Sequence, residues 1–477
     1  MKNYKNIVVF SFVTACLLAI SCKTPQNTTE IKSKPLPESF AISSIDTNTV
    51  ATKSWKTFYT DPYLIKLIDT ALVNNYDVLM SLQKIKAAQS DVLFSKGAML
   101  PNLSAAATAG VSRFGQYTMD GAGNNGTEIY NGTDIPKNLT DYFIGLQTSW
   151  ELDVFGKLKN QKKAALARVL SSEAMRNVVT TNLIAEIATN YYELLSLDQS
   201  IKIIDKNIAI QENALEMVVI MKETAVSNEL AVKQFRAQLL NIKAMKFELL
   251  QQITETENKI NFLIGSYPKP IDRETSFIDA NLPKEINFGI PSALLQNRPD
   301  IKMAEFDMLA SKADVKSAKA AFYPTLSITG SVGYQALKPD LLFNPQSVAY
   351  NILGGLTAPL INRSAIRASF NKANASQIDA MYNYQKTILN GYIEVNNEMM
   401  RMNNLKGSFE LKSDESNTLN QSIDIATDLF KFGRANYLEV LNVQQNALEA
   451  ELDLIDVKKQ QFQSIVNIYK AVGGGWK

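Results

Sequence analysis

The sequence predicts an α+β membrane protein in which short strands cross a bilayer and long helices form a coiled coil. Three observations predict this fold. The 108 residues from Lys157 to Ile264 contain no glycine or proline and are rich in strong helix formers. Four shorter stretches alternate apolar with small or polar residues, and the sequence also matches itself along its length. Such helices exceed what a compact domain needs, and the strands have membrane-crossing length.

The internal match predicts two structural repeats. Asp77 to Ser104 aligns with Asp300 to Ser327, with ten identities in 28 positions. Asn228-x-Leu230-x-Val232 aligns with Asn436-x-Leu438-x-Val440 at an offset that is smaller by about 15 residues. The first repeat therefore carries about 15 extra residues, which lie in a loop rich in Gly and Asn within 117–140. We expect repeat 1 over 61–267, an equatorial connector over 268–290 and repeat 2 over 291–477.

Each repeat is expected to contain a long helical hairpin. Ile187, Tyr191 and Leu194 belong to an apolar stripe at helical spacing. A helix from Lys157 to Lys222 would be on the order of 100 Å long at 1.5 Å per residue, a length that suits a coiled coil. The helical patterns break at about 224–230 and 432–438, where we place the hairpin tips.

Each repeat is also expected to contain a β-hairpin, at about 102–153 and 325–360. In the second hairpin Leu326, Ile328 and Val332 alternate with small or polar residues. Four strands cannot close a barrel, and hydrocarbon does not tolerate an open sheet edge. Membrane insertion therefore requires several chains, and three chains give a homotrimer with a 12-stranded β-barrel. The alternation alone leaves open two soluble hairpins on a core.

The N-terminus is typical of an exported lipoprotein. Residues 1–21 have a basic start and a short apolar run, as in a secretory signal peptide. Cys22 follows Leu18-Ala19-Ile20-Ser21, which resembles a lipobox, so we expect lipid on Cys22 and a lipidated segment over 22–60. Cys16, preceded by Val13-Thr14-Ala15, is an alternative attachment site. A plain signal peptide with two unmodified cysteines is another.

Composition argues against several functions. After residue 21 the chain has 47 basic and 47 acidic residues, so no charge excess favours nucleic acid. The chain has no histidine and no glycine-rich phosphate loop, and no carboxylate pair is singled out. We therefore predict no enzyme activity, no cofactor and no metal site.

Several motifs together resemble the outer membrane factor (TolC-like) family, in its lipoprotein branch that serves resistance-nodulation-division efflux pumps. The resemblance covers essentially the whole mature chain, beginning with the signal and its cysteine. The motifs are Pro291-Ser292-Ala293-Leu294-Leu295-Gln296-Asn297-Arg298-Pro299-Asp300-Ile301, Ala320-Ala321-Phe322-Tyr323-Pro324-Thr325-Leu326, Trp150-Glu151-Leu152-Asp153-Val154-Phe155-Gly156-Lys157 and Ala471-Val472-Gly473-Gly474-Gly475-Trp476.

The resemblance implies a homotrimer in the outer membrane whose helical barrel crosses the periplasm and meets a periplasmic adaptor and an inner-membrane pump. It places the adaptor contact at the two tips, at Ala225, Val226, Ser227, Gly433, Arg434 and Ala435. It places the pore constriction at Glu439, which keeps the family's acidic charge, and at Asn442, which does not. The family's tip latch of an aromatic hydroxyl and a basic residue falls on Phe430 and Ala435, with Arg434 one step away. The first tip has Ala225 where a glycine is usual.

The implied function is a passive exit duct for drugs or other small molecules, as the outer-membrane part of a tripartite efflux pump. Two alternatives remain within the same fold: an exit duct for type I protein secretion or one for metal efflux. A third belongs to another class, a lipid-anchored coiled-coil spacer without a pore. A solvated flank is the alternative position for Glu439.

Overall fold

The computed structural model describes residues 35–40, 49–130, 132–274, 277, 288–359 and 364–477. Cys16 and Cys22, and with them the predicted signal peptide, lie outside these residues. The chain divides into two compact units. One contains Ala87–Val169 and Phe306–Met381, and the other contains Lys32–Lys86, Leu170–Glu305 and Tyr382–Lys477. We call them the sheet unit and the helical unit. Each unit draws on both predicted repeats, whose boundaries stay a prediction.

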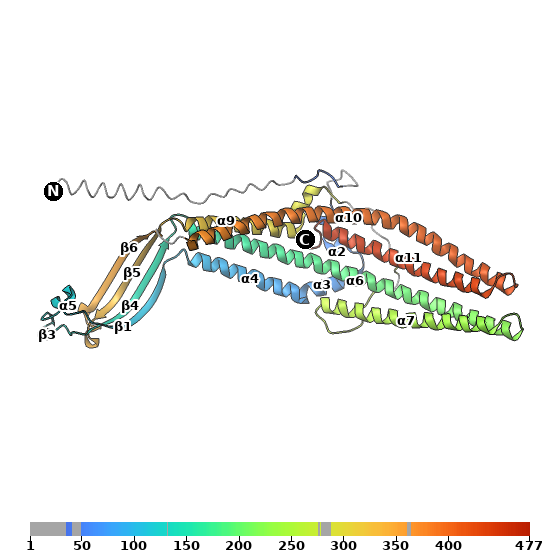
Figure 1. Cartoon of the computed structure of the whole chain (residues 1–477), viewed down its shortest axis with the longest axis horizontal. Helices are drawn as coiled ribbons and strands as arrows, with labels where there is room; N and C mark the ends of the chain where they lie inside the picture. The colour runs from blue at the N-terminus through green and yellow to red at the C-terminus, as the bar shows by residue number, and fades with distance from the viewer. Residues whose placement is uncertain (1–34, 41–48, 131, 275–276, 278–287, 360–363) are drawn as a thin grey trace. The chain divides into compact units, whose positions relative to one another are not determined.

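The sheet unit is built on one four-stranded antiparallel sheet in the order β1-β4-β5-β6 (Figure 1). The four stretches that alternate in the sequence form these strands. Their bounds are Asn102–Ser112 for β1, Leu139–Leu152 for β4, Thr325–Ala336 for β5 and Val348–Thr357 for β6. The central pair, β4 with β5, joins the two hairpins that the sequence predicts separately. The four alternating stretches therefore share one sheet, with β1 and β6 at its edges.

The long helices adjoin the strands in sequence and pair into hairpins (Figure 1). Strand β1 follows α4 and strand β5 follows α9, while β4 leads into α6 and β6 into α10. Short turns connect α6 to α7 and α10 to α11. The helices are α4 (Tyr76–Gly97), α6 (Lys157–Glu223), α7 (Glu229–Leu263), α9 (Pro299–Ala320), α10 (Ser364–Lys431) and α11 (Tyr437–Ala471), with short α2 (Trp55–Phe58), α3 (Pro62–Asn74) and α8 (Leu294–Asn297), and 3-10 turns η1 (Val50–Thr52), η2 (Pro291–Ala293), η3 (Pro339–Leu341) and η4 (Pro345–Ser347).

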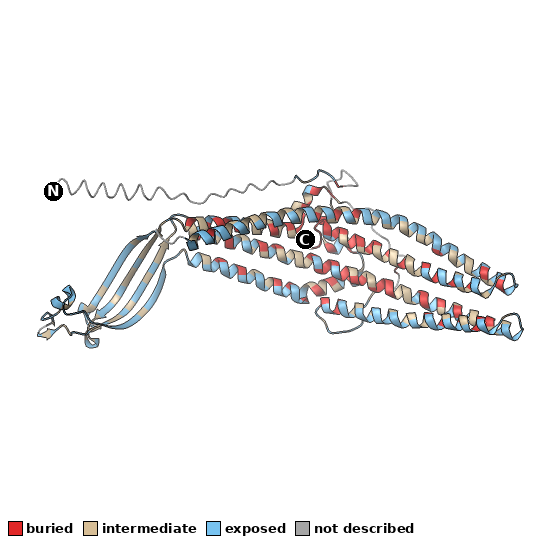
Figure 2. Ribbon diagram, in the orientation of Figure 1, coloured by how far each residue is buried: buried red, intermediate tan, exposed pale blue. Residues whose placement is uncertain are grey.

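The helical unit has a continuous apolar core, seen as red stripes along its helices in Figure 2. Tyr191 and Ile187 of α6 are fully buried there, together with Leu64 of α3 and Val466 of α11. Ion pairs on the solvent side hold each hairpin in register, for example Lys246 of α7 with Asp205 of α6 at 2.6 Å. The stability of the long helices therefore comes from apolar packing between helices, as is usual in coiled coils.

A buried arginine ties the start of the second repeat to the C-terminus. Arg298 forms bidentate hydrogen bonds with Asp300 at 3.0 and 2.7 Å, and its Nη1 donates to Glu394 and to the Ala471 carbonyl at 2.7 and 2.8 Å. Burial lowers the pKa of Arg298, but the hydrogen bonds and charges of Asp300 and Glu394 outweigh it and raise that pKa above its usual value. Gly391 leaves room for the guanidinium, since a Cβ there would lie 3.1 Å from Arg298 Nε.

Two further observations concern the described part of the chain. None of its helices combines the length and hydrophobicity needed to cross a membrane. The Gly- and Asn-rich loop between β1 and β4, predicted only as a long loop, contains α5 (Met119–Gly123) and the small strands β2 (Glu128–Tyr130) and β3 (Thr133–Asp134). These elements are too short to leave a periodic signal in the sequence.

Candidate functional site

One face of the sheet is apolar across all four strands. The register places Leu146 of β4 beside Val332 of β5, and Val332 in turn beside Tyr350 of β6. On the other side of β4, Ala105 of β1 lies beside Leu146. Since side chains alternate between faces, each second residue along these strands continues the same surface. Its other large members are Leu103, Val111, Tyr142, Ile144, Trp150, Leu152, Leu326, Ile328, Tyr334, Val348, Ile352 and Leu356.

The opposite face is mostly small and polar. Gln147 of β4 lies beside Ser331 of β5 and Ser104 of β1, and Ser149 lies beside Thr329. Gly145 and Gly333 are direct partners, and a Cβ at either would clash with the backbone of the other strand. The two strands therefore approach each other closely at this point, as they do where a sheet bends.

The sheet has no buried residue in the single chain, on either face (Figure 2). Tyr350 and Ile352 of β6 are 81% and 80% exposed, and Val111 of β1 is 72% exposed. Strands β1 and β6 are the edges of the sheet, so each has an outer row of backbone groups without a partner strand among the described residues. An exposed apolar face with two open edges is a surface that another chain or a lipid environment must cover.

The turn between α6 and α7 is a Schellman motif centred on an alanine. Val226 N donates to Met221 O at 2.8 Å and Ala225 N donates to Lys222 O at 3.0 Å. Ala225 has φ 59°, the left-handed conformation that glycine usually supplies at this position. The Asn228 side chain then caps α7 by accepting from Ala231 N at 3.0 Å.

The turn between α10 and α11 has the same geometry. Arg434 N donates to Leu429 O at 2.8 Å and Gly433 N donates to Phe430 O at 3.0 Å. Gly433 has φ 67° and takes the place of Ala225. The Asn436 side chain caps α11 by accepting from Leu438 N and Glu439 N at 2.7 and 3.3 Å.

The shared Asn-x-Leu-x-Val motif is explained by this geometry. The asparagines cap the returning helices, and Val232 and Val440 are buried at 6% and 2% exposure. Both valines belong to a small apolar cluster with Phe235 and Phe430, to which α6, α7, α10 and α11 all contribute. The two turns of one chain are thus held together by a core of their own.

The candidate tip residues are mostly exposed. Ala225, Val226, Gly433 and Arg434 are exposed, while Ser227 and Ala435 are intermediate. Of the two positions that the family resemblance assigns to a latch, Phe430 is buried in the apolar cluster and Ala435 packs against it. These two positions therefore contribute apolar packing in this chain.

Glu439 and Asn442 lie on one exposed face of α11, three residues apart. Glu439 is in the first turn of the helix, where the macrodipole favours a carboxylate. None of the described residues forms an ion pair with it. In the other turn, Glu229 accepts from Lys222 at 2.6 Å and pairs with Lys233 at 3.3 Å. The hydrogen bond from Lys222, followed by that from Lys233, lowers the pKa of Glu229.

A polar cluster that the sequence did not predict connects the two helical hairpins at a level away from the turns. Glu451 of α11 accepts from Lys206 and Asn207 of α6 at 2.9 and 3.3 Å, and from Asn420 of α10 at 3.1 Å. Gln211 of α6 donates to Gln444 of α11 at 3.0 Å in a buried contact. No signal in the sequence distinguishes Glu451 from other carboxylates on these helices. Within the described chain, no group of three or more acidic side chains is placed to hold a metal ion.

Comparison with known proteins identifies the family. The model of the outer membrane efflux protein family matches residues 67–266 and 290–474. The chain therefore belongs to the outer membrane efflux protein family, and it is an outer-membrane component of an efflux system. The predicted family, efflux function and outer-membrane location are confirmed.

The relatives span almost the whole chain. The cation efflux system protein CusC of Escherichia coli O6:H1 is 25% identical over 98% of this chain and 97% of its own length. The solvent efflux pump outer membrane protein SrpC of Pseudomonas putida is 26% identical, over 88% of this chain and 87% of its own. The crystal structure of a membrane protein from Pseudomonas aeruginosa superposes with a TM-score of 0.84 at 26% identity, and covers 94% of this chain and 97% of that one.

The two turns give a matched pair of substitutions. The left-handed conformation costs an L-residue roughly 1–2 kcal/mol, and the greater unfolded-state freedom of glycine offsets about half of this. Ala225→Gly should therefore stabilise the first turn by about 0.5–1 kcal/mol, and Gly433→Ala should destabilise the second by a similar amount. No atom lies within 4 Å of a Cβ built on Gly433, so sterics do not confound the comparison.

Hydrogen exchange at the turn amides measures both effects. Exchange at Val226 should slow about two- to fivefold in Ala225→Gly, and exchange at Arg434 should accelerate by a similar factor in Gly433→Ala. Each variant is the control for the other turn. Shifts in the same direction in both variants would contradict the assignment of the strain to φ.

Proposed function

We propose that three copies of this chain form a channel through the outer membrane, with a 12-stranded β-barrel continued by an α-helical barrel built from two structural repeats per chain. The sheet carries this proposal, because it combines one exposed apolar face, one small and polar face and two open edges. Closing three such sheets edge to edge satisfies every outer backbone group. The apolar face then contacts lipid and the polar face lines a lumen, as in other outer-membrane barrels.

In this arrangement the channel is the passive exit duct of a tripartite pump for drugs or other small molecules. The exposed turns at Ala225, Val226, Ser227, Gly433, Arg434 and Ala435 contact a periplasmic adaptor, which connects the duct to an inner-membrane pump. The names of the relatives refer to cations and to solvents at nearly equal identity to this chain. We therefore infer that the pump selects the substrate and that the duct accepts a broad range.

The trimer is tested by two substitutions on neighbouring residues of β6. Ile352 is on the apolar face and Asn351 is on the opposite face. A lysine on the lipid face costs about 2–4 kcal/mol near the bilayer midplane, whereas one facing the lumen remains hydrated. Ile352→Lys should therefore reduce the yield of assembled trimer from membranes, and Asn351→Lys should leave it close to wild type.

Mass measurement in mild detergent provides the readout. The wild-type chain should elute at three times its mass of 52.9 kDa, after correction for processing and bound detergent. We expect strong SDS to dissociate the trimer. A monodisperse monomer with unchanged secondary structure would rule out the trimeric barrel.

We also propose that the mature chain begins at Cys22 and is anchored by acyl chains on that residue. The lipobox-like run before Cys22 supports this position, because cleavage before Cys16 would leave apolar residues 17–20 on the mature end. Cys22→Ser should abolish metabolic labelling with a fatty acid, while Cys16→Ser should retain it. Labelling that depends on Cys16 alone would transfer the anchor to that residue.

Glu439 and Asn442 are proposed to face the narrow periplasmic entrance of the duct. Three unpaired carboxylates at one level of a narrow pore concentrate negative potential and favour cations. In planar bilayers Glu439→Gln should reduce cation selectivity and block by divalent ions, and Glu439→Lys should shift selectivity toward anions. Asn442→Asp should have the opposite effect and increase cation selectivity and block by divalent ions. Glu229→Gln, in the first turn of α7, is the control.

The competing position for Glu439 is a solvated flank of the coiled coil. There a single charge change alters stability by less than about 0.5 kcal/mol and hardly affects selectivity. Unchanged reversal potentials in both Glu439 variants would move the constriction elsewhere, with residues 434–436 the next candidates. A complete lack of conductance in the wild type, with the trimer intact, would favour the non-conducting spacer.

A further inference from the structure

The loop between β1 and β4 is an addition to the symmetric plan of the channel. The first repeat has about 15 more residues here than the second, where β5 and β6 are joined by a shorter segment with two 3-10 turns. Both connections leave the sheet at the strand ends opposite those that join the long helices. A channel subunit does not need the extra residues for barrel closure, so their fold calls for another explanation.

The extra residues are organised by hydrogen bonds of their own. The Thr118 side chain donates to the Gly115 carbonyl at 2.7 Å and accepts from Gly121 N at 3.1 Å, which starts α5. Ile135 N donates to Thr127 O at 2.8 Å, and so links strand β3 to the loop before β2. Gly121 is required by this packing, since a Cβ there would clash with the carbonyl of Gly115.

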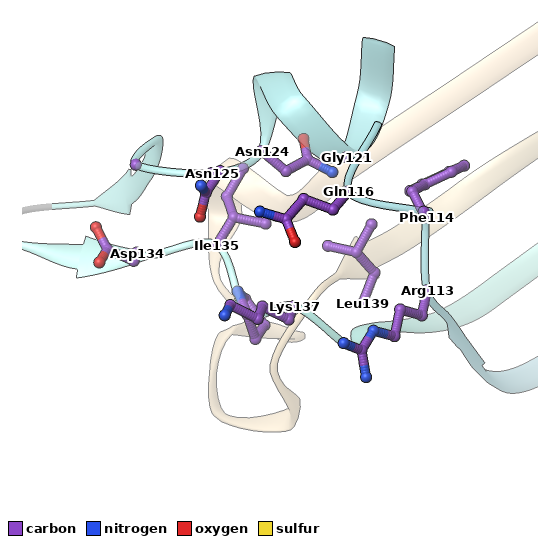
Figure 3. Close-up of a pocket in the computed structure, with 13 residues that line it drawn as sticks. Arg113, Phe114, Gln116, Gly121, Asn124, Asn125, Asp134, Ile135, Lys137 and Leu139 are labelled. Atoms are coloured by element: carbon purple, nitrogen blue, oxygen red, sulfur yellow. The ribbon is translucent and has the colours of Figure 1, made fainter. Parts of the chain in front are cut away.

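The folded loop borders an open cavity of about 460 Å³ (Figure 3). This volume is within the range of about 300–1,000 Å³ found for small-molecule sites. Arg113 directly follows β1 and Lys137 shortly precedes β4, and the terminal strand pair Ser112 with Leu139 brings the two cations to the same cavity. Neither cation forms an ion pair or a hydrogen bond within the described residues.

Three carboxamides share the rest of the lining with glycines and with the apolar side chains of Phe114, Ile135, Pro136 and Leu139. Gln116, Asn124 and Asn125 offer carboxamide donors and acceptors, and Figure 3 shows them on the opposite side of the cavity from Arg113 and Lys137. Asp134 is the one acidic residue in the lining. Two cations beside several carboxamides are suited to a ligand that has both an anionic group and many hydroxyls.

We propose that this loop cavity binds an acidic saccharide, a sugar bearing phosphate or carboxylate groups, with Arg113 and Lys137 on the anionic group and the carboxamides on the hydroxyls. The location rests on the proposed function, which places these strand ends at the outer surface of the cell. Two sources share this chemistry there: the headgroup of an anionic glycolipid in the outer leaflet, and a soluble polysaccharide.

The test uses the full-length protein and phosphorylated oligosaccharide released from lipopolysaccharide by deacylation. Calorimetric titration in detergent should show binding to the wild type, and weaker binding to the same oligosaccharide after its phosphates are removed. The double variant Arg113→Gln with Lys137→Gln should lose at least about tenfold in affinity, because it removes two charge-assisted contacts. Lys338→Gln, in the β5–β6 connection and outside the cavity, should stay within about twofold.

Gly121→Ala is the second variant, since it disturbs the cavity without changing the charge. It should also weaken binding about tenfold. Equal affinities in the wild type and the double variant would overturn the proposal, as would an equal loss in Lys338→Gln, which would indicate a general charge effect.

Nanodiscs containing intact lipopolysaccharide separate the two sources. Tighter binding in nanodiscs than to the free oligosaccharide, lost in the double variant, assigns the site to the glycolipid. Equal binding of both probes assigns it to the saccharide alone. Titration of the soluble oligosaccharide does not require a conducting channel, so a failure of the proposed function would appear in bilayer conductance and not in this measurement.

Discussion

The outer edges of β1 and β6 set the main constraint on this protein. Each edge has backbone groups that no described strand pairs with, and the sheet between them has an apolar face that none of the described residues covers. In water such a sheet would aggregate, and in hydrocarbon each unpaired N–H or C=O would cost several kcal/mol. The edge-to-edge closure proposed above would resolve both problems at once. The proposed oligomer therefore rests on the needs of the sheet's backbone.

In the helical unit, four very long helices must be held in register with one another. Apolar stripes alone allow neighbouring helices to slide by one turn, since each turn presents a similar surface. Glu451, which contacts both α6 and α10, fixes one level. The buried pair of Gln211 with Gln444 fixes another, and the asparagine-capped turns fix the end. The buried amide pair is the strongest of these constraints, because a slip by one turn would leave both carboxamides without a partner.

Sequence could predict the strands and helices because their signals are local. Apolar residues that recur every two positions in a strand, or every 3.6 in a helix, can be recognised in a short stretch of sequence. This pattern located all four strands of the sheet and both helical hairpins. The contacts of Glu451 depend on three helices that meet only in the folded chain. No short stretch of the sequence contains residues from all three. Ala225 is a different case, because its left-handed φ contradicts the local preference of alanine. Its alignment with Gly433 is the signal in the sequence that could have indicated this conformation.

The two helix turns also help to interpret Glu439. A carboxylate in the first turn of a helix needs no functional reason, since the macrodipole favours it in either hairpin. In the first hairpin, however, the acid of this turn is Glu229, and Lys222 and Lys233 neutralise it. Glu439 meets the same helical preference without a partner cation among the described residues. The macrodipole explains a carboxylate in both turns, but it does not explain why Glu229 has partner cations and Glu439 has none in the described part of the chain. The proposed position at the pore entrance would give this unpaired charge a role.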